Sequence, residues 1–119
     1  MTALAIQMSH RQDRTVLALA GDLDVASCPH LDDAVEAALC VGCRHLVVDA
    51  AGLRFCDSHG LEALLHAVDA LGQVHGTVAL VNVHGLLRRV LDITQTAAYF
   101  AAVTDAPVSC EARPPWRAP

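Results

Sequence analysis

The sequence of 119 residues predicts a single α/β domain, with a mixed β-sheet of four to five strands covered by helices. Two observations support this prediction. Continuous apolar runs, which are typical of strands, alternate along the chain with segments whose apolar residues recur at helical spacing. Glycine or a polar cluster separates most of these segments. The predicted order is strand, strand, helix, strand, helix, strand, helix, strand.

Five segments are expected to form strands. A short polar connection joins the first two, and Gly21 is expected to end the second. The third and fourth are apolar almost throughout, which is typical of strands buried on both faces. The five expected strands are residues 3–9, 15–20, 45–49, 77–81 and 101–103. Residues 50–57 are expected to form a loop.

Three helices are expected between these strands. The first has Ser27 as its candidate N-cap and Pro29 in its first turn, where proline costs least. The second begins with Ser58 as its candidate N-cap and closes after Gly72. The inner faces of the three helices are expected to be Leu31, Ala34, Val35, Ala38 and Leu39; Leu61, Leu64, Leu65, Val68 and Leu71; and Leu86, Leu87, Val90 and Leu91.

The composition changes near the end of the chain. Residues 1–103 are expected to form the domain, and residues 104–119 a flexible, proline-rich C-terminal tail without a fold of its own. The tail carries Trp116, the only tryptophan. Two interpretations of Trp116 stay open: it docks on the domain, or it is an exposed contact residue.

Composition and charge exclude several classes of protein. Apolar residues make up 54% of the chain, so it is expected to fold, but no apolar run reaches the roughly 18 residues that span a membrane. The N-terminal residues do not resemble a signal peptide, so a cytoplasmic location is expected. The net charge is −5, and scattered arginines form no basic stripe. Direct nucleic-acid binding and membrane binding are therefore not expected.

The five cysteines do not predict a metal or redox site. Cys40 and Cys43 form the only Cys-x-x-Cys pair, and no second pair of ligands at zinc spacing follows. The pair comes at the end of a predicted helix, whereas a reactive thiol of the thioredoxin type lies at a helix start. Both cysteines are expected to be reduced and free of metal, and no cofactor is expected.

The run Asp57-Ser58-His59 contains the three residue types of a hydrolase triad but does not predict an enzyme. Consecutive residues entering a helix diverge by roughly 100° each, so their side chains do not converge on one point. The nucleophile elbow has the pattern Gly-x-Ser-x-Gly, and Cys56 occupies the first glycine position here. No catalytic residue is therefore expected.

The run Asp57-Ser58-His59-Gly60-Leu61 resembles the Asp-Ser-Ser/Thr-Gly-Leu motif of the anti-sigma factor antagonists, the bacterial members of the STAS domain family. Residues 21–24 resemble the family's Gly-Glu-Leu-Asp, and residues 46–49 resemble its central strand. Residues 88–94 resemble the family's helix with the pattern Arg-Leu-hydrophobic-x-hydrophobic-Thr. The four matches follow the family order and cover about residues 3–103. Two departures are His59, where the family has Ser or Thr, and Gln95, where it has Gly.

The resemblance implies a fold, a phosphorylation site and a partner. The helices gather on one face of the sheet, and Ser58 is the phosphorylated residue. The implied partner is an anti-sigma factor that is also a GHKL-type serine kinase, and a metal-dependent serine phosphatase reverses the modification. The implied partner-binding residues are Asp22, Asp24, Asp57, Ser58, His59 and Gly60.

The position of Ser58 is consistent with this role, because a helix N-terminus favours an added phosphate. An alternative stays open: the chain is an unswitched STAS scaffold or a small-ligand-binding module within a larger complex. His59 favours that alternative slightly. The chemistry of Ser58 distinguishes the two, since only the switch requires it.

Overall fold

The computed structural model describes residues 3–11 and 14–105. The strands and helices follow one another in the order that the sequence predicts, which confirms the α/β class. In chain order they are β1 (Ala5–Arg11), β2 (Arg14–Leu23), α1 (Cys28–Cys40), β3 (His45–Cys56), α2 (Ser58–Gly72), β4 (Thr77–Val81), α3 (Gly85–Thr94), the 3₁₀ turn η1 (Ala97–Tyr99) and β5 (Ala102–Val103).

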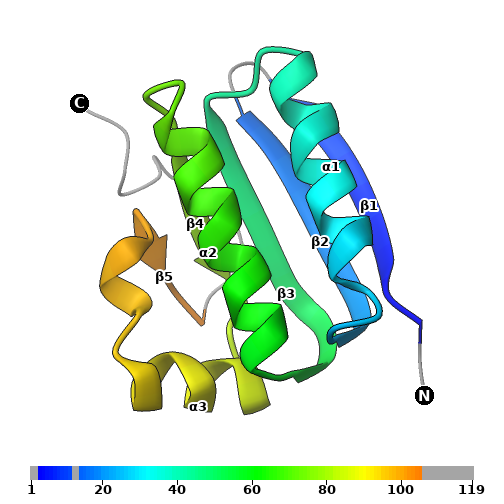
Figure 1. Ribbon diagram of the computed structural model, residues 1–119, viewed down its shortest axis with the longest axis vertical. Coiled ribbons are helices and arrows are strands. Elements are labelled where there is room, and N and C mark those ends of the chain that lie inside the picture. The colour runs from blue at the N-terminus through cyan, green and yellow to red at the C-terminus, as the bar shows by residue number, and fades with distance from the viewer. Residues whose placement is uncertain (1–2, 12–13, 106–119) are drawn as a thin grey trace.

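The five strands form one mixed sheet in the spatial order β1-β2-β3-β4-β5. β1 and β2 form an antiparallel hairpin, and every later pairing is parallel. Helices α1 and α2 lie side by side along one face of this sheet, and α3 crosses its lower end (Figure 1). The helices thus gather on one face, as expected.

One apolar core lies between the sheet and the helices. Alternate residues of β2, and of β3 before its register shifts, point into it, and so do the inner faces of α1 and α2. Leu64 and Leu71 of α2 are fully buried, whereas Leu65 and Val68 are partly buried against the core. The largest fully buried side chains of this core are Leu17, Leu19, Leu23, Leu31, Leu46, Leu64, Leu71, Leu80, Leu91, Val48 and Val78.

Several expected strand bounds are wrong. β1 is Ala5–Arg11 instead of residues 3–9. β2 continues past Gly21 to Leu23, and β3 continues through the expected loop to Cys56. The pairing of β2 with β3 shifts register between Ala18 and Ala20, and again after Gly21, whose φ is 105°. Such bulges break the alternation of buried and exposed residues. Buried residues recur in this part of β3 at every third position, so the segment lacks the period of two that predicts a strand from sequence.

The expected inner face of α3 is wrong at one residue. Leu86 is 41% exposed, while Leu87 and Leu91 are buried. This helix has only ten residues, and its core contact is the narrow stripe made by two leucines four positions apart. Gln95 ends α3 in the left-handed conformation, with φ of 56°, and donates its N–H to the carbonyl of Leu91. Glutamine here adopts the conformation that the family's glycine adopts readily.

The chain leaves the sheet after β5. The N–H of Thr104 donates to the carbonyl of Leu80, and the carbonyl of Thr104 accepts from Val83. Trp116 lies outside the described residues, as does the rest of residues 106–119. Among the helices of residues 3–11 and 14–105, none is both long and apolar enough to span a membrane.

Candidate functional site

The extended ends of β2 and β3 bring two distant parts of the sequence together. Asp22 pairs with Phe55, and Leu23 pairs with Cys56. The loop that follows β2 therefore lies beside the first turn of α2, which begins at Ser58. All six residues expected to bind a partner are at this one end of the sheet, although they come from two segments more than 30 positions apart.

The N-cap of α2 is Asp57, and the expectation that Ser58 caps this helix is wrong. Asp57 has the extended backbone of an N-cap, with φ of −102° and ψ of −169°. Its Oδ1 accepts a hydrogen bond from the N–H of Gly60 at 3.0 Å, and its carbonyl accepts from Leu61. Because the Asp57 carboxylate makes the capping hydrogen bond, the hydroxyl of Ser58 is not needed for it.

Ser58 is the first residue of α2 and is exposed. Among the described residues, its hydroxyl has no hydrogen-bond partner, and neither has its own N–H or that of His59. These two amides are at the positive end of the helix dipole. An accessible hydroxyl therefore lies beside two unpaired donors, which is an arrangement that accommodates an anion.

Gly60 allows α2 to start against the end of β2. A Cβ atom at this position would lie 2.6 Å from the carbonyl oxygen of Leu23 and 2.9 Å from the Sγ of Cys56. Real Cβ atoms do not approach backbone oxygens so closely. The glycine thus holds the first turn of α2 in direct contact with the β2 end, and it fixes the distance between the two segments of the site.

The loop between β2 and α1 is closed by its own hydrogen bonds. Asp24 Oδ1 accepts from the N–H groups of Ala26 and Ser27, both at 3.1 Å. The Ser27 hydroxyl donates to the carbonyl of Asp22 at 2.8 Å and accepts from the N–H of Asp24 at 2.9 Å. Ser27 is at the N-cap position of α1, as expected, but it is buried and its side chain makes no capping hydrogen bond. The Ser27 side chain therefore bonds to residues that precede it, Asp22 and Asp24, and not to the N–H groups of α1.

A small groove runs between α1 and α2 beside Ser58. It has a volume of about 150 Å³, and its walls include Cys28, Asp32, His59 and Glu62. The Nδ1 of His59 lies 3.8 Å from the Oδ2 of Asp57, and both side chains are partly exposed. In the described part of the chain, no base is hydrogen-bonded to Ser58 Oγ, as a serine nucleophile requires.

Acidic side chains surround the thiol of Cys28 at this groove. Burial raises the pKa of Cys28, and the charges of Asp32, Asp57, Asp24 and Glu62 raise it further, in that order. Behind it, burial raises the pKa of the Cys56 thiol to about 12, with smaller contributions from Asp57 and Cys28. Both thiols therefore stay protonated at neutral pH. Within the described residues, no group of three or more His, Cys, Asp and Glu side chains is placed to hold a metal ion.

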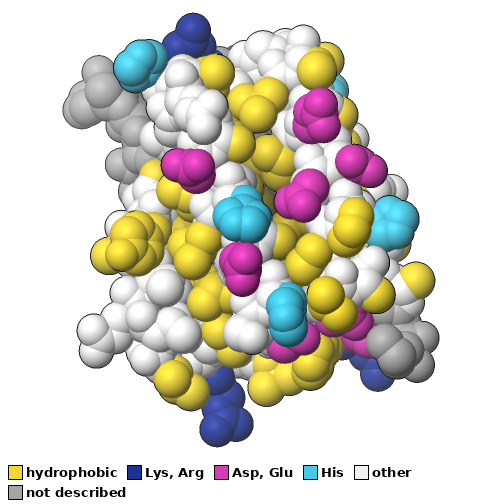
Figure 2. Space-filling view, in the orientation of Figure 1, with side chains coloured by type: hydrophobic (Ala, Val, Ile, Leu, Met, Phe, Trp, Pro, Cys, Tyr) yellow, Lys and Arg dark blue, Asp and Glu magenta, His cyan; other side chains and the backbone are white. Residues whose placement is uncertain are grey.

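Sequence reasoning missed two apolar residues at this end of the sheet. Val25, in the closed loop, is 65% exposed, and Phe55, near the end of β3, is 38% exposed. The sequence did carry a signal for Val25: this apolar residue follows Asp24 and precedes Ser27 in a polar loop, outside any expected strand or helix. Figure 2 shows the α1–α2 face, where Asp, Glu and His side chains lie among apolar ones and arginines appear only at the margins. The surface near Ser58 is thus acidic with exposed apolar residues.

Comparison with known proteins gives one family. Residues 6–98 match the family model described as Mlab, STAS domain. The Anti-sigma F factor antagonist of Paenibacillus polymyxa is 31% identical over 96 residues, which are 76% of this chain and 79% of that protein.

Solved structures have the same fold. An anti-sigma factor antagonist from Mycobacterium paratuberculosis superposes with a TM-score of 0.75 at 23% identity, covering 89% of this chain and 87% of that one. The Bacillus cell fate determinant SpoIIAA in its phosphorylated form superposes with a TM-score of 0.68 at 21% identity, covering 90% and 94%. With the sequence match over most of its length, the chain belongs to the STAS domain family, among the anti-sigma factor antagonists.

Proposed function

We propose that this protein is a partner switch whose binding to an anti-sigma factor is controlled by phosphorylation of Ser58. The unmodified chain binds an anti-sigma factor that is also a GHKL-type serine kinase, and binding releases a sigma factor. The kinase then phosphorylates Ser58 and ends the interaction. A metal-dependent serine phosphatase restores the unmodified chain, which itself is not an enzyme.

The observation that carries this proposal is the contrast between two serines at neighbouring helix starts. Ser58 is exposed, and its hydroxyl has no partner within residues 3–11 and 14–105. Ser27 also precedes a helix, but it is buried and its hydroxyl bonds to Asp22 and Asp24. A kinase can reach the first without unfolding the chain, whereas modification of the second requires the closed loop to open.

A phosphate at Ser58 changes charge more than shape. It adds about 1.5 to 2 negative charges beside the carboxylate of Asp57, whose side chain is 33% exposed. The unpaired amides of Ser58 and His59 favour the phosphate in the free protein. In a closed interface, a dianion without new partners is costly, and each 1.4 kcal/mol lowers affinity about tenfold.

The surface around Ser58 indicates the chemistry of its partner. The carboxylates of Asp32 and Glu62 line the small groove, and those of Asp57 and Asp24 are near enough to Cys28 to raise the pKa of its thiol. Val25 adds an exposed apolar side chain to the same groove. A complementary partner surface presents basic side chains around an apolar centre, which speeds association and selects the partner. The relative's name, an antagonist of an anti-sigma factor, supports a protein as that partner.

The test is incubation of the chain with its anti-sigma kinase and ATP, followed by mass spectrometry of the peptides. One phosphate is expected, on Ser58, with Ser27 unmodified as the internal control. Ser58→Ala should abolish phosphorylation and keep kinase binding, because it removes the acceptor without adding charge. Ser58→Asp should weaken binding, though less than phosphate does, because it carries a single negative charge.

Other results would remove the proposal. If no phosphate appears on Ser58 and Ser58→Asp binds the kinase as tightly as the unmodified chain, the switch is excluded. Unaltered binding with no modification would instead support the unswitched scaffold. His59→Ser, which restores the residue type of the family motif, should leave the site usable; loss of phosphorylation in that variant would contradict the assigned acceptor.

A further inference from the structure

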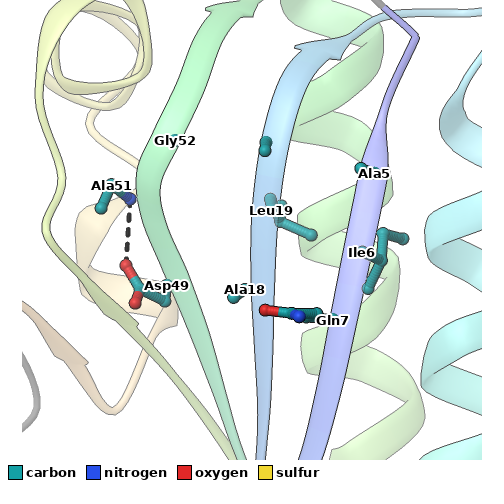
Figure 3. Close-up of a pocket in the computed structure, with 9 residues that line it drawn as sticks. Ala5, Ile6, Gln7, Ala18, Leu19, Asp49, Ala51 and Gly52 are labelled. Carbon is teal, nitrogen blue, oxygen red and sulfur yellow. Dashed lines mark hydrogen bonds between the residues drawn. The ribbon is translucent and has the colours of Figure 1, made fainter.

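The sheet ends at β1, and the outer edge of this strand is open. β1 is paired with β2 on one side and comes first in the strand order. Figure 1 shows it as the last strand on the side of α1, and Figure 3 shows the side chain of Gln7 lying toward β2 and not over the outer edge. Among residues 3–11 and 14–105, none makes a backbone hydrogen bond to this edge.

The backbone groups that point outward belong to Ile6, Met8 and His10. Only two residues of the sequence separate Arg11 from Arg14, and these arginines are partners in the β1–β2 register. They must exchange their hydrogen bonds directly, because the alternative pattern would require a bond between two adjacent residues. Bonded and non-bonded pairs alternate along an antiparallel ladder. Every second residue back from Arg11 is therefore bonded to β2, and the residues between them direct their N–H and C=O groups away from it.

The edge lacks the usual protection against pairing with another strand. Native sheets protect an open edge with proline, lysine, a bulge or a very short strand. β1 has seven residues, none of them proline or lysine, and its register with β2 has no shift. At the other end of the described sheet, β5 has only two residues. Of these two edges, β1 is the one long enough to take a further strand.

The side of α1 next to this edge is apolar as well. Cys28 and Asp32 line the groove toward α2, so the opposite side of α1 lies toward β1, which the helix contacts. That opposite side carries Ala34, Ala37 and Val41, at the spacing of three and four that places residues on one helix face. Ala37 is exposed, and Val41 is 64% exposed. An open strand edge and an uncharged helix side are thus adjacent.

We propose that β1 pairs antiparallel with β1 of a second copy of the chain, so that the two five-stranded sheets become one across a two-fold axis. In the register centred on Met8, all the outward backbone groups of both strands find partners. Opposite residues in this register are Ala5 and Arg11, Ile6 and His10, Gln7 and Ser9, and Met8 with Met8 of the second copy. No two like charges face each other, so the strand is complementary to itself.

The helices support the same pairing. Because α1 contacts both β1 and β2, the α1 helices of the two copies would lie side by side over the joined strands. Ala34, Ala37 and Val41 are short enough for two helices to pack at the usual distance of about 8–10 Å. The groove beside Ser58 lies on the other side of α1, so both copies keep an accessible Ser58.

The test measures the mass of the 119-residue chain by sedimentation equilibrium over a concentration series that extends above about 100 μM, since a small interface binds weakly. The expected result is a mass that rises from one chain to two and then stops. Met8→Pro removes an N–H that points away from β2, so the hairpin keeps its hydrogen bonds. This variant should retain the circular dichroism of the domain and stay at the mass of one chain.

A matched pair of charge variants tests the α1 side. Ala37→Glu adds a carboxylate close to the same position of the second copy, and it should weaken the dimer by about tenfold or more through like-charge repulsion. Ala98→Glu makes the same substitution at an exposed position in η1, near β5 at the opposite edge of the sheet, and should leave the dissociation constant unchanged. If Met8→Pro does not fold, this pair decides the question.

Three results would overturn the proposal. The first is the mass of a single chain throughout the series. The second is a dimer that folded Met8→Pro retains or, if that variant does not fold, a dimer that Ala37→Glu and Ala98→Glu form equally well. The third is a mass that continues to rise beyond two chains, because pairing through a single edge closes at two copies.

Discussion

The thiol of Cys28 donates a hydrogen bond to the carbonyl oxygen of His59 across 3.3 Å. Cys28 is the first residue of α1, and His59 is the second residue of α2. Because burial and nearby carboxylates raise the pKa of Cys28, the thiol keeps its proton and remains a donor. The starts of the two helices are therefore joined directly beside Ser58.

The contact between Gly60 and Leu23 predicts the effect of one methyl group. Gly60→Ala should destabilise the fold by about 1–3 kcal/mol, because the new Cβ meets a backbone oxygen that cannot move without moving β2. Gly72→Ala is the matched control at the other end of α2, where a Cβ meets nothing within 4 Å. It should be neutral or stabilising by up to about 1 kcal/mol. Urea unfolding measures both, and equal midpoints would contradict the close contact.

The carboxylate of Asp57 has two separable roles, the helix cap and the surface charge. Asp57→Ala should cost about 0.5–2 kcal/mol of stability, since the N–H of Gly60 loses its acceptor. Asp57→Asn keeps an N-cap oxygen and should leave stability nearly unchanged. If a basic partner surface contacts this carboxylate, as proposed, calorimetric titration with the anti-sigma factor should show weaker binding by Asp57→Asn. Binding as tight as wild type would assign Asp57 to the cap alone.

A substitution at Leu64 tests how much the packing of α2 against the core contributes to stability. Its side chain is 0% exposed, so Leu64→Ala should cost about 2–5 kcal/mol. Ile93→Ala, at a side chain that is 77% exposed on α3, should change stability by less than about 0.5 kcal/mol. Denaturant midpoints compare the two variants. An unchanged denaturation midpoint for Leu64→Ala would contradict the packing of α2 against the core.

The raised pKa of Cys56 predicts a loss of stability in alkaline solution. A cysteine has a pKa of 9.0 without the fold, against about 12 for Cys56 within it. Below pH 9 both states hold the proton, and the contribution of this thiol to stability is complete. Between about pH 9 and pH 12 the unfolded chain loses the proton first, so the free energy of unfolding falls as the pH rises.

Chemical denaturation at a series of pH values tests this. The chain has no lysine, so no ammonium group of that type titrates in the same range. Above pH 9, the free energy of unfolding of Cys56→Ala should fall less steeply with pH than that of the wild type, whatever the stability of the variant at pH 7. At pH 8, iodoacetamide should modify the exposed Cys40 before the buried Cys56. Parallel declines, or equal modification rates, would contradict the burial of Cys56.

The sequence predicts the order of elements, and the position of the motif at a helix start, because both depend on local patterns. Apolar runs and helical spacing identify each strand and helix, and the motif at residues 57–61 falls at the start of α2. The extension of β3 to Cys56 is not predictable in this way. Its buried residues, Ala50, Leu53 and Cys56, follow a spacing of three that only the bulged pairing with β2 produces.

The details of the site depend on contacts between distant residues. A serine and an aspartate are both good N-caps, so the sequence could not decide between Ser58 and Asp57. The backbone of Asp57 settles it, and that backbone follows from the strand that precedes it. In the same way, nothing local reveals that the Ser27 hydroxyl is used within its own loop.

If the loop of residues 22–27 contacts the partner, as proposed, its closed shape affects how that partner is recognised. The Ser27 hydroxyl and the Asp24 carboxylate already form hydrogen bonds within the loop, so the loop holds one shape before a partner binds. Ordering a mobile side chain on binding costs about 0.5–1.5 kcal/mol, and a preformed loop avoids much of that loss. Association then resembles the docking of two rigid bodies, with an affinity that depends on how well the partner's contour already matches.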